Sequence, residues 1–298
     1  MSLEDKLREW SKPPSDSERE RIDRTERMVR EAIRESTDPH IKNATVFTKG
    51  SVKAGTNIKQ NSDIDVCVMA DGVFFPSYPN GLGAADFGNI NSDYSFLTFR
   101  DGVERALANY FGSLFVDTSG NKHIEIRNTS SESRVDADVV PAFEHKRYSS
   151  LGSLPSSGIE LRHKANHSSV INWPHHNYNN SVAKYNSTSQ RYRRMVRILK
   201  WVREKILEQN PNAQFDAQSF LIESLLWNTP NARYGNTSYA DDISGILGFL
   251  RAALQNDHSI NEWGEVNELK YLFRSTQKWT REGALQFVNA ADAYLGDL

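Results

Sequence analysis

The chain has 298 residues, enough for one large domain or two closely packed lobes. Its 38% hydrophobic and 25% charged residues are typical of a soluble globular protein, and its net charge of −2 argues against a generally basic nucleic-acid coat. No run approaches the ~20 apolar residues of a membrane span, and the charged start MSLEDKLREW lacks a signal peptide's apolar core. The single cysteine, Cys67, allows no disulfide framework and is expected in the core. We therefore expect a cytoplasmic protein that requires neither a membrane nor a structural nucleic acid.

The first half of the chain predicts a mixture of helices and strands. Helices are expected at residues 2–11 and about 17–36, and strands at 43–49 and 63–69. Residues 71–93 contain prolines and several glycines, which predicts a long irregular segment. A helix at 94–112, short strands at 114–118 and 122–127, a strand at 134–143 and a hairpin of 159–162 with 168–172 follow. Pro141 predicts that the far end of the 134–143 strand is an edge or the strand's exit.

The second half predicts helices. One begins at Gln190, with a basic side that is expected to be mostly solvated. A second covers 211–227 with Asp216 as its N-cap, and further helices are expected at 239–255 and 266–296.

The most informative stretch runs from Gly50 to Met69 and reads GSVKAGTNIKQNSDIDVCVM. A glycine lets backbone N–H groups approach a phosphate closely, and Ser51 adds a hydroxyl, so the pair indicates a phosphate-binding turn. Asp63 and Asp65 open the next strand and share one of its faces, because strand side chains alternate. Two carboxylates this close repel each other unless a cation lies between them, and hard oxygen ligands favour Mg²⁺ or Mn²⁺.

A further acid is expected in the strand that begins near Arg134. Asp136 and Asp138 share one face there, and a neighbouring strand lies about 4.8 Å away. Either carboxylate could therefore reach metal ions held by Asp63 and Asp65. Two-metal phosphoryl transfer uses ions about 3.5–4 Å apart with carboxylates around them. The residue types alone leave Asp136 and Asp138 as alternatives.

Strand, Gly-Ser pair, polar turn and Asp-x-Asp together resemble the polymerase-β-type nucleotidyltransferase core. The stretch Asp138-Val-Val-Pro-Ala-Phe143 looks like the third catalytic position of 2′-5′-oligoadenylate synthetases and of cGAS/DncV-like nucleotidyltransferases, which favours Asp138 over Asp136. The stretch Ile171-Asn-Trp-Pro, with Asn186 and Tyr192-Arg-Arg-Met-Val-Arg after it, is similar to clade E of the bacterial CD-NTases.

This resemblance covers about residues 10 to 255 and implies an α+β fold. A polymerase-β-like core with a mixed twisted sheet and helices is expected in residues 1–185, including an N-terminal helix that spans both lobes. An all-helical C-terminal lobe is expected in residues 186–298, with the active site in the cleft between the two.

The resemblance also implies a set of site residues. Asp63, Asp65 and Asp138 are expected to be catalytic and to bind two Mg²⁺ or Mn²⁺ ions. The other positions that match nucleotide-binding residues of the family are Gly50, Ser51, Lys200, Ser219, Phe220 and Asn172. Lys200 and Ser219 are expected to contact the triphosphate, whereas Phe220 either stacks on a base or belongs to the core. The resemblance to clade E implies that Asn172 favours uracil, and its amide can offer both a donor and an acceptor to a pyrimidine edge.

The implied function is a nucleotidyltransferase that joins two nucleoside triphosphates, with UTP and ATP favoured, into a cyclic dinucleotide of the CD-NTase type. A separate effector protein would sense this product in CBASS antiphage defence. The alternatives are an enzyme that makes a linear oligonucleotide or modifies RNA or protein, and an inactive relative that binds nucleotide or RNA.

Overall fold

The computed structural model describes residues 2–58, 63–128, 134–213, 215, 217–256, 258–274 and 277–298. The chain divides into two compact units. The sheet unit comprises Ser15–Val52 and Asn61–Pro174, and the helical unit comprises Met1–Pro14, Lys53–Gln60 and His175–Leu298. The main division thus falls at residue 174, where the sequence had suggested 185. Helix α1 (Leu3–Trp10) belongs to the helical unit and α2 (Asp16–Arg34) to the sheet unit.

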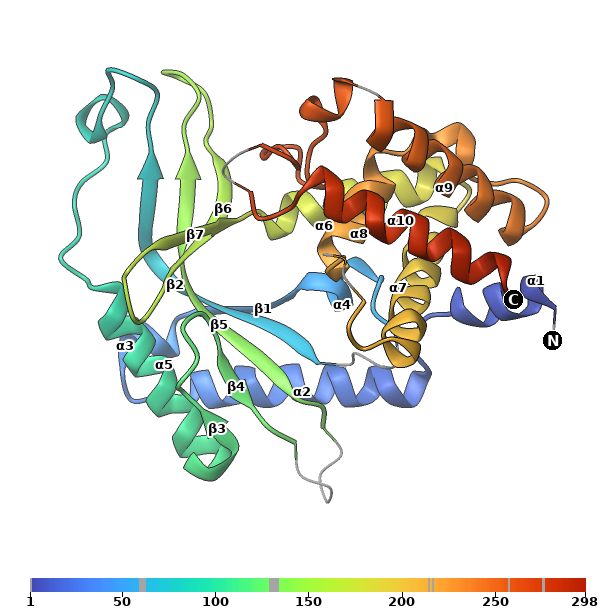
Figure 1. The fold of residues 1–298 in the computed structure, drawn as a ribbon. Helices are drawn as coiled ribbons and strands as arrows, with labels where there is room; N and C mark the ends of the chain where they lie inside the picture. Colours follow the sequence, from blue (N-terminus) through green and yellow to red (C-terminus); the bar gives the residue numbers. More distant parts are fainter. Residues whose placement is uncertain are drawn as a thin grey trace. The chain divides into compact units, whose positions relative to one another are not determined.

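The sheet unit is built on a mixed sheet, which has seven strands in the described part of the chain (Figure 1). β2 and β5 pair in parallel and every other pair is antiparallel. The spatial order is β1 (Thr45–Lys49), β2 (Ile64–Ser77), β5 (Ala137–Arg147), β4 (Ile124–Ile126) and β3 (Val116–Asp117), and β6 (Ser156–Arg162) and β7 (Ser169–Asn172) continue from the second half of β5. The mixed sheet with its helices confirms the predicted α+β fold class.

Alternation along β2 separates a buried face from an acidic one. Ile64, Val66 and Val68 are fully buried in the core that includes side chains of α2 and α5 (Phe96–Phe111), and Figure 1 shows α2 running along this side of the sheet. Asp63 and Asp65 therefore take the opposite face. Cys67 shares that face but is fully buried, and burial raises the pKa of its thiol to about 12, which confirms it as a core residue.

The strand β2 is longer than the sequence predicted. Pairing with β5 becomes irregular between Met69 and Phe74 and then continues to Ser77, so the expected irregular segment begins later. Gly72 adopts a positive φ of 74° inside this irregularity. Pro76 is tolerated because β1 pairs with β2 from Asp65 to Met69 and leaves the later part as an edge.

Pro141 lies inside β5, opposite Val68 of β2, and not at a strand exit as predicted. On the other side of β5, pairing with β4 reaches Val139, and pairing with β6 begins at Phe143. Position 141 therefore falls between two ladder partners on that side. A residue without an N–H donor fits there without costing a ladder hydrogen bond.

The helical unit shares one hydrophobic core. Its longer helices after α1 are α6 (Pro174–Ser187), α7 (Arg191–Gln209), α8 (Ser219–Asn228), α9 (Tyr239–Asn256) and α10 (Arg281–Gly296). Helix α8 begins later than predicted, with Gln218 as its N-cap, and Asp216 lies outside the described residues. The predicted helix at 266–296 is reduced to α10, because Glu268 adopts a positive φ of 58° and Thr280 caps the later start. None of the helices in the described ranges has the length and apolar character needed to cross a bilayer.

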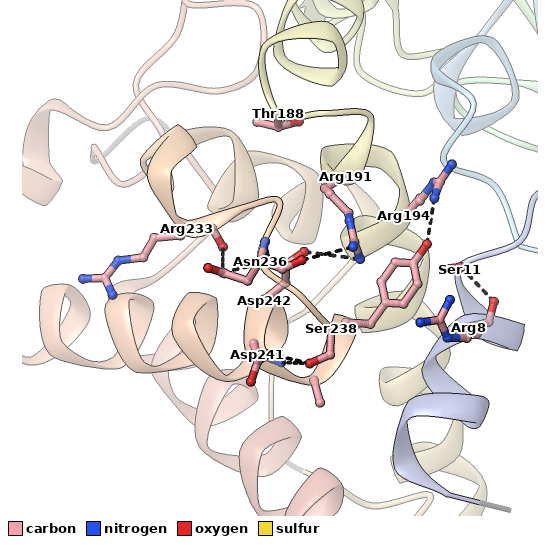
Figure 2. A network of polar contacts seen from close by, with 12 residues as sticks. Arg8, Ser11, Thr188, Arg191, Arg194, Arg233, Asn236, Ser238, Asp241 and Asp242 are labelled. Carbon is pink, nitrogen blue, oxygen red and sulfur yellow. Dashed lines mark hydrogen bonds and ion pairs between the residues drawn. The ribbon is translucent and has the colours of Figure 1, made fainter.

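The basic side of α7 is less solvated than predicted (Figure 2). Arg191 Nη1 lies 3.5 Å from Oδ2 of Asp242, a fully buried carboxylate, and the other oxygen of Asp242 accepts the backbone N–H of Asn236 at 2.8 Å. Arg194 donates a 2.7 Å hydrogen bond to the hydroxyl of Tyr239. These arginines tie α7 to the start of α9, which is a structural role.

Candidate active site

The strand register brings the predicted acids onto neighbouring strands. Asp65 of β2 lies directly opposite Asp138 of β5 in the parallel pair. Asp63 precedes Asp65 by two residues and therefore shares its face. Neighbouring strands are about 4.8 Å apart, so Asp65 and Asp138 are nearest neighbours although they are far apart in the sequence.

These acids belong to a row of charged residues that crosses the sheet. The successive register partners are Lys49 of β1, Asp65, Asp138 and Glu125 of β4. Lys49 Nζ lies 2.8 Å from Asp65 Oδ1, and the pair is partly exposed. His123, just before β4, places its Nε2 3.6 Å from Asp138 Oδ1. Basic groups thus lie on both sides of the acids, with Lys49 next to Asp65 and His123 next to Asp138.

Burial and the repulsion of neighbouring carboxylates raise the pKa of Asp63 and of Asp138. Burial is the main cause of the raised pKa of Asp63, and the charges of Asp136, Glu125 and Asp65 raise it further. Burial also raises the pKa of Asp138, where the charges of Asp65 and Asp63 act in the same direction and His123 opposes them. A bound cation would relieve this repulsion.

The structure distinguishes the two candidates for the third acid. The Asp138 carboxyl group belongs to the residue directly opposite Asp65. The Asp136 carboxylate accepts a hydrogen bond from the backbone N–H of Asn128, and its own carbonyl accepts the N–H of Ile64 at 3.0 Å. This arrangement supports Asp138 as the third acid, as the resemblance implies.

Position 50 requires a glycine for two reasons: its backbone conformation and the side chain that lies next to it. It begins the short helix α4 (Gly50–Ala54), which also contains Ser51, and adopts a positive φ of 67°. A Cβ atom at this position would lie 2.2 Å from Asp65 Oδ2. The Gly-Ser turn therefore packs directly against one of the acids, so a phosphate bound to its N–H groups would lie beside that carboxylate.

The carboxylates of Asp63, Asp65 and Asp138 share one face beside the Gly50–Ser51 turn, and oxygen ligands of this kind fit a hard divalent cation. In the conformation described, however, no three acidic, histidine or cysteine side chains among the described residues converge closely enough to hold a metal ion. Asp65 is paired with Lys49 instead.

Asn172 shares the acidic face of the sheet but lies far from the acids. It pairs with Ile159 of β6, which pairs with Glu144 of β5. Ile159 also belongs to the small apolar cluster with Cys67 and Ala142 on this face. Glu144 is separated from Asp138 by roughly 20 Å of extended strand. The register therefore places Asn172 outside the group of acids, and its contact with a base stays a prediction.

Lys200 lies in the helical unit, and its ammonium group binds to residues of that unit. Its side chain is 2% exposed, and its Nζ lies 2.7 Å from Glu223 Oε1 and 3.1 Å from the carbonyl oxygen of Thr56. Burial lowers the pKa of Lys200, and the charge of Glu223 opposes this shift. The expected contact with a triphosphate therefore requires a phosphate to compete with Glu223 for the ammonium group.

Ser219 and Phe220 form the first turn of α8. The Ser219 hydroxyl accepts a 3.2 Å hydrogen bond from Arg203 Nη1, so a basic group already lies beside the predicted phosphate contact. Phe220 is partly buried against the helical core, which agrees with the core alternative named for it and leaves the stacking role as a prediction.

Sequence reasoning missed Lys49, His123 and Glu125. Lys49 directly precedes the Gly-Ser pair, and its place next to that motif was the available signal. Its partner could not be read from the sequence, because the pairing depends on the register of β1 and β2. Glu125 lies on the short strand β4 and His123 directly precedes it, and the register of β4 with β5 is likewise set by the tertiary structure.

Comparisons with known proteins give a consistent result. The family model of the cGAS/DncV-like nucleotidyltransferase C-terminal helical domain matches residues 179–296. The chain is 35% identical to the cyclic dipyrimidine nucleotide synthase CdnE of Cecembia lonarensis, over 93% of this chain and 92% of the relative. It is 31% identical to a cyclic dipurine nucleotide synthase of Elizabethkingia meningoseptica, over 98% of each. The structure of the Rhodothermus marinus CdnE c-UMP-AMP synthase with Apcpp and Upnpp superimposes with a TM-score of 0.86 at 27% identity, covering 99% of this chain and 96% of that one.

We expect Asp138→Asn to stabilise the metal-free protein. The raised pKa of Asp138 means that the ionised carboxylate is less favourable in the folded than in the unfolded chain. This cost is absent below the ordinary pKa of 3.8 and grows as the pH rises through the folded-state value. The melting temperature in EDTA should therefore rise by about 1–3 °C at about pH 7.5, and the gain should shrink towards about pH 4.

The matched control is Asp71→Asn, which removes an exposed acid of the neighbouring strand β2. It should leave the melting temperature nearly unchanged at each pH. A lower melting temperature for Asp138→Asn across the pH range would show that the carboxylates do not repel each other in the folded protein.

Proposed function

The chain belongs to the cGAS/DncV-like nucleotidyltransferases, the CD-NTases, and on this premise we propose that it joins two nucleoside triphosphates into a cyclic dinucleotide and releases pyrophosphate. The observation that carries the proposal is the pairing of Asp65 with Asp138 on parallel strands, with Asp63 on the same face. The Gly50–Ser51 turn packs against Asp65, so a phosphate bound at the turn would lie next to a metal ion held by the acids.

Each residue has a separate task in the proposed reaction. Asp63 and Asp65 would hold two Mg²⁺ or Mn²⁺ ions, and Asp138 would hold the ion nearest the acceptor hydroxyl. When bound, such ions lower the pKa of the attacking hydroxyl and neutralise charge on the phosphates. The N–H groups and hydroxyl at Gly50 and Ser51 would bind phosphate oxygens and orient the α-phosphate for in-line attack.

Two transfers of the same kind complete the product. A ribose hydroxyl of one nucleotide attacks the α-phosphorus of the other, the bond to the bridging oxygen breaks, and pyrophosphate leaves. A hydroxyl of the second nucleotide then attacks the α-phosphorus that remains on the linear intermediate, and a second pyrophosphate leaves. In the helical unit, Lys200 and Ser219 are proposed to bind the triphosphate, and Phe220 to stack on a base.

The bases are proposed to include uracil, with UTP and ATP as substrates. The relatives compared above are named for dipyrimidine, dipurine and UMP-AMP products, so membership of the family does not by itself specify the base. The match of Asn172 to the clade E position that favours uracil supports a pyrimidine, and its amide can both donate to and accept from a uracil edge. As the resemblance implies, the product would act as a second messenger that a separate effector senses in CBASS antiphage defence.

We expect a cyclic product when the protein is incubated with all four nucleoside triphosphates and Mg²⁺ or Mn²⁺. Mass spectrometry before and after phosphatase treatment should show the same product, since a cyclic dinucleotide has no terminal phosphate. Asp63→Asn and Asp138→Asn should each reduce pyrophosphate release by about 10³-fold, because each removes a metal ligand.

Asp136→Asn is the control, since Asp136 lies on the same face but bonds to backbone at Asn128. This variant should retain activity within severalfold of the unmodified protein. A product that phosphatase shortens would indicate a linear oligonucleotide, and full turnover by Asp138→Asn would remove that residue from the metal site.

We expect Asn172→Ser to change the choice of base without ending catalysis. A serine cannot present a donor and an acceptor as an amide does, so the ratio of kcat/KM for UTP to that for the other nucleotides should change by about tenfold. Asn166→Ser, in the turn between β6 and β7, is the matched control. An unaltered product profile would show that Asn172 does not read the base.

Lys200 is best tested together with Glu223. Lys200→Met should lower the melting temperature, because it leaves the buried Glu223 carboxylate without its counter-ion. It should also raise the KM for nucleoside triphosphates by about tenfold if the ammonium binds the triphosphate. The double variant Lys200→Met/Glu223→Gln should recover most of the melting temperature while the KM stays high. Recovery of both quantities would show that Lys200 has a structural role alone.

A further inference from the structure

Lys49 is the basic residue nearest to the predicted metal ligands in the acidic row. It is the last residue of β1, and the antiparallel register places it directly opposite Asp65. Its Nζ lies 2.8 Å from Asp65 Oδ1, and the two side chains are 16% and 39% exposed. The pair is therefore well defined in geometry and still reachable by solvent ions.

The Asp65 carboxylate is held on two sides. Oδ1 is paired with Lys49, and Oδ2 lies in the space that a Cβ of Gly50 would occupy. This orientation is consistent with the finding that, across the described ranges, no three potential ligands converge as a metal site requires. The Lys49 ammonium group lies against Asp65 Oδ1, an oxygen with which Asp65 would bind a metal ion.

We propose that Lys49 is a built-in counter-ion that holds Asp65 in the metal-free enzyme and transfers to the substrate's phosphates when a divalent ion binds. The proposal rests on the proposed function, because it assumes that Asp65 is a metal ligand and that a triphosphate binds at the Gly50–Ser51 turn. Lys49 thus acts through Asp65 before the metal ion binds, and it contacts the substrate's phosphates afterwards.

The electrostatics favour such an exchange. Asp65 and Asp138 are register partners of like charge, so the metal-free sheet gains from a cation beside them. A divalent ion that binds alone must displace the ammonium group and leave it without a counter-charge. A triphosphate at the adjacent Gly50 supplies phosphate oxygens for the released ammonium, and the four-carbon stem of a lysine gives it the reach to move.

The consequence is positive coupling between metal and nucleotide. Lys49 weakens metal binding in the absence of nucleotide and strengthens it when a triphosphate is present. Since coupling between two ligands is reciprocal, the metal ion also raises the affinity for the triphosphate by the same factor. The enzyme would then bind its metal ions mainly together with substrate.

The test measures Mn²⁺ binding directly, from the electron paramagnetic resonance signal of free Mn²⁺, with and without a non-hydrolysable UTP analogue. Lys49→Met should bind Mn²⁺ alone about three- to tenfold more tightly than the unmodified protein, because a competing cation is gone. The factor by which the analogue strengthens Mn²⁺ binding should be smaller in this variant. Lys49→Gln, which keeps a polar group at the position, should behave in the same way.

Two controls separate the possible results. Lys146→Met makes the same charge change at the far end of β5, where Lys146 pairs with Glu144, and should leave Mn²⁺ affinity unchanged. Asp65→Asn should weaken Mn²⁺ binding in every background. If Asp65 is required but both Lys49 variants bind Mn²⁺ no more tightly than the unmodified protein, or if Lys146→Met binds it equally tightly, the role of Lys49 is overturned and the proposed function stands. If Mn²⁺ binding does not depend on Asp65, both are overturned.

Discussion

The parallel pairing of β2 with β5 is the constraint on which the candidate site depends. It places Asp65 opposite Asp138, and like charges on facing positions destabilise a sheet. The register is held by the other face, where Ile64, Val66 and Val139 are fully buried. Each such side chain contributes about 1.5–3 kcal/mol. Because a slip by one residue would exchange the two faces, apolar burial outweighs the repulsion and fixes the acids together.

The sheet topology places the rest of the site at the same end of the strands. β1 runs antiparallel to β2, so it ends at Lys49 beside the start of β2 at Asp65. β5 runs parallel to β2 and therefore begins at the same end of the sheet, with Asp138 near its start. The Gly50 turn follows β1 directly and packs against Asp65. Three separate segments of the chain therefore converge at this end of the sheet, which is why the Gly50–Ser51 turn and three acids share one place.

The parts of this arrangement that local chemistry determines were predictable from the sequence. The alternation around Asp63 and Asp65, the Gly-Ser pair and the hairpin of β6 and β7 each depend on a few neighbouring residues. The extension of β2 was missed because Gly72 and Pro76 are normally strand breakers, and an irregularity in pairing and an unpaired edge accommodate them.

Other features could not be read locally because they depend on distant partners. The pairing of Lys49 with Asp65 follows from the strand register, and the engagement of Lys200 follows from Glu223 on the next helix. The helix predicted at residues 266–296 was too long for a different reason. Residues 266–280 have a helical apolar pattern, but the positive φ of Glu268 and the Thr280 cap delay the helix to Arg281.

The two lysines near predicted phosphate contacts illustrate how burial decides what a charge can do. Lys49 and Asp65 are partly exposed, and an ion pair in such a position contributes about 0–1 kcal/mol, so a divalent cation can replace it at little cost. Lys200 and Glu223 are 2% and 10% exposed, and separating a buried pair costs about 3–5 kcal/mol. A triphosphate would have to offset that cost to draw Lys200 away. Lys49 is therefore the lysine that can move at little cost, whereas a phosphate would have to compete with Glu223 for the ammonium group of Lys200.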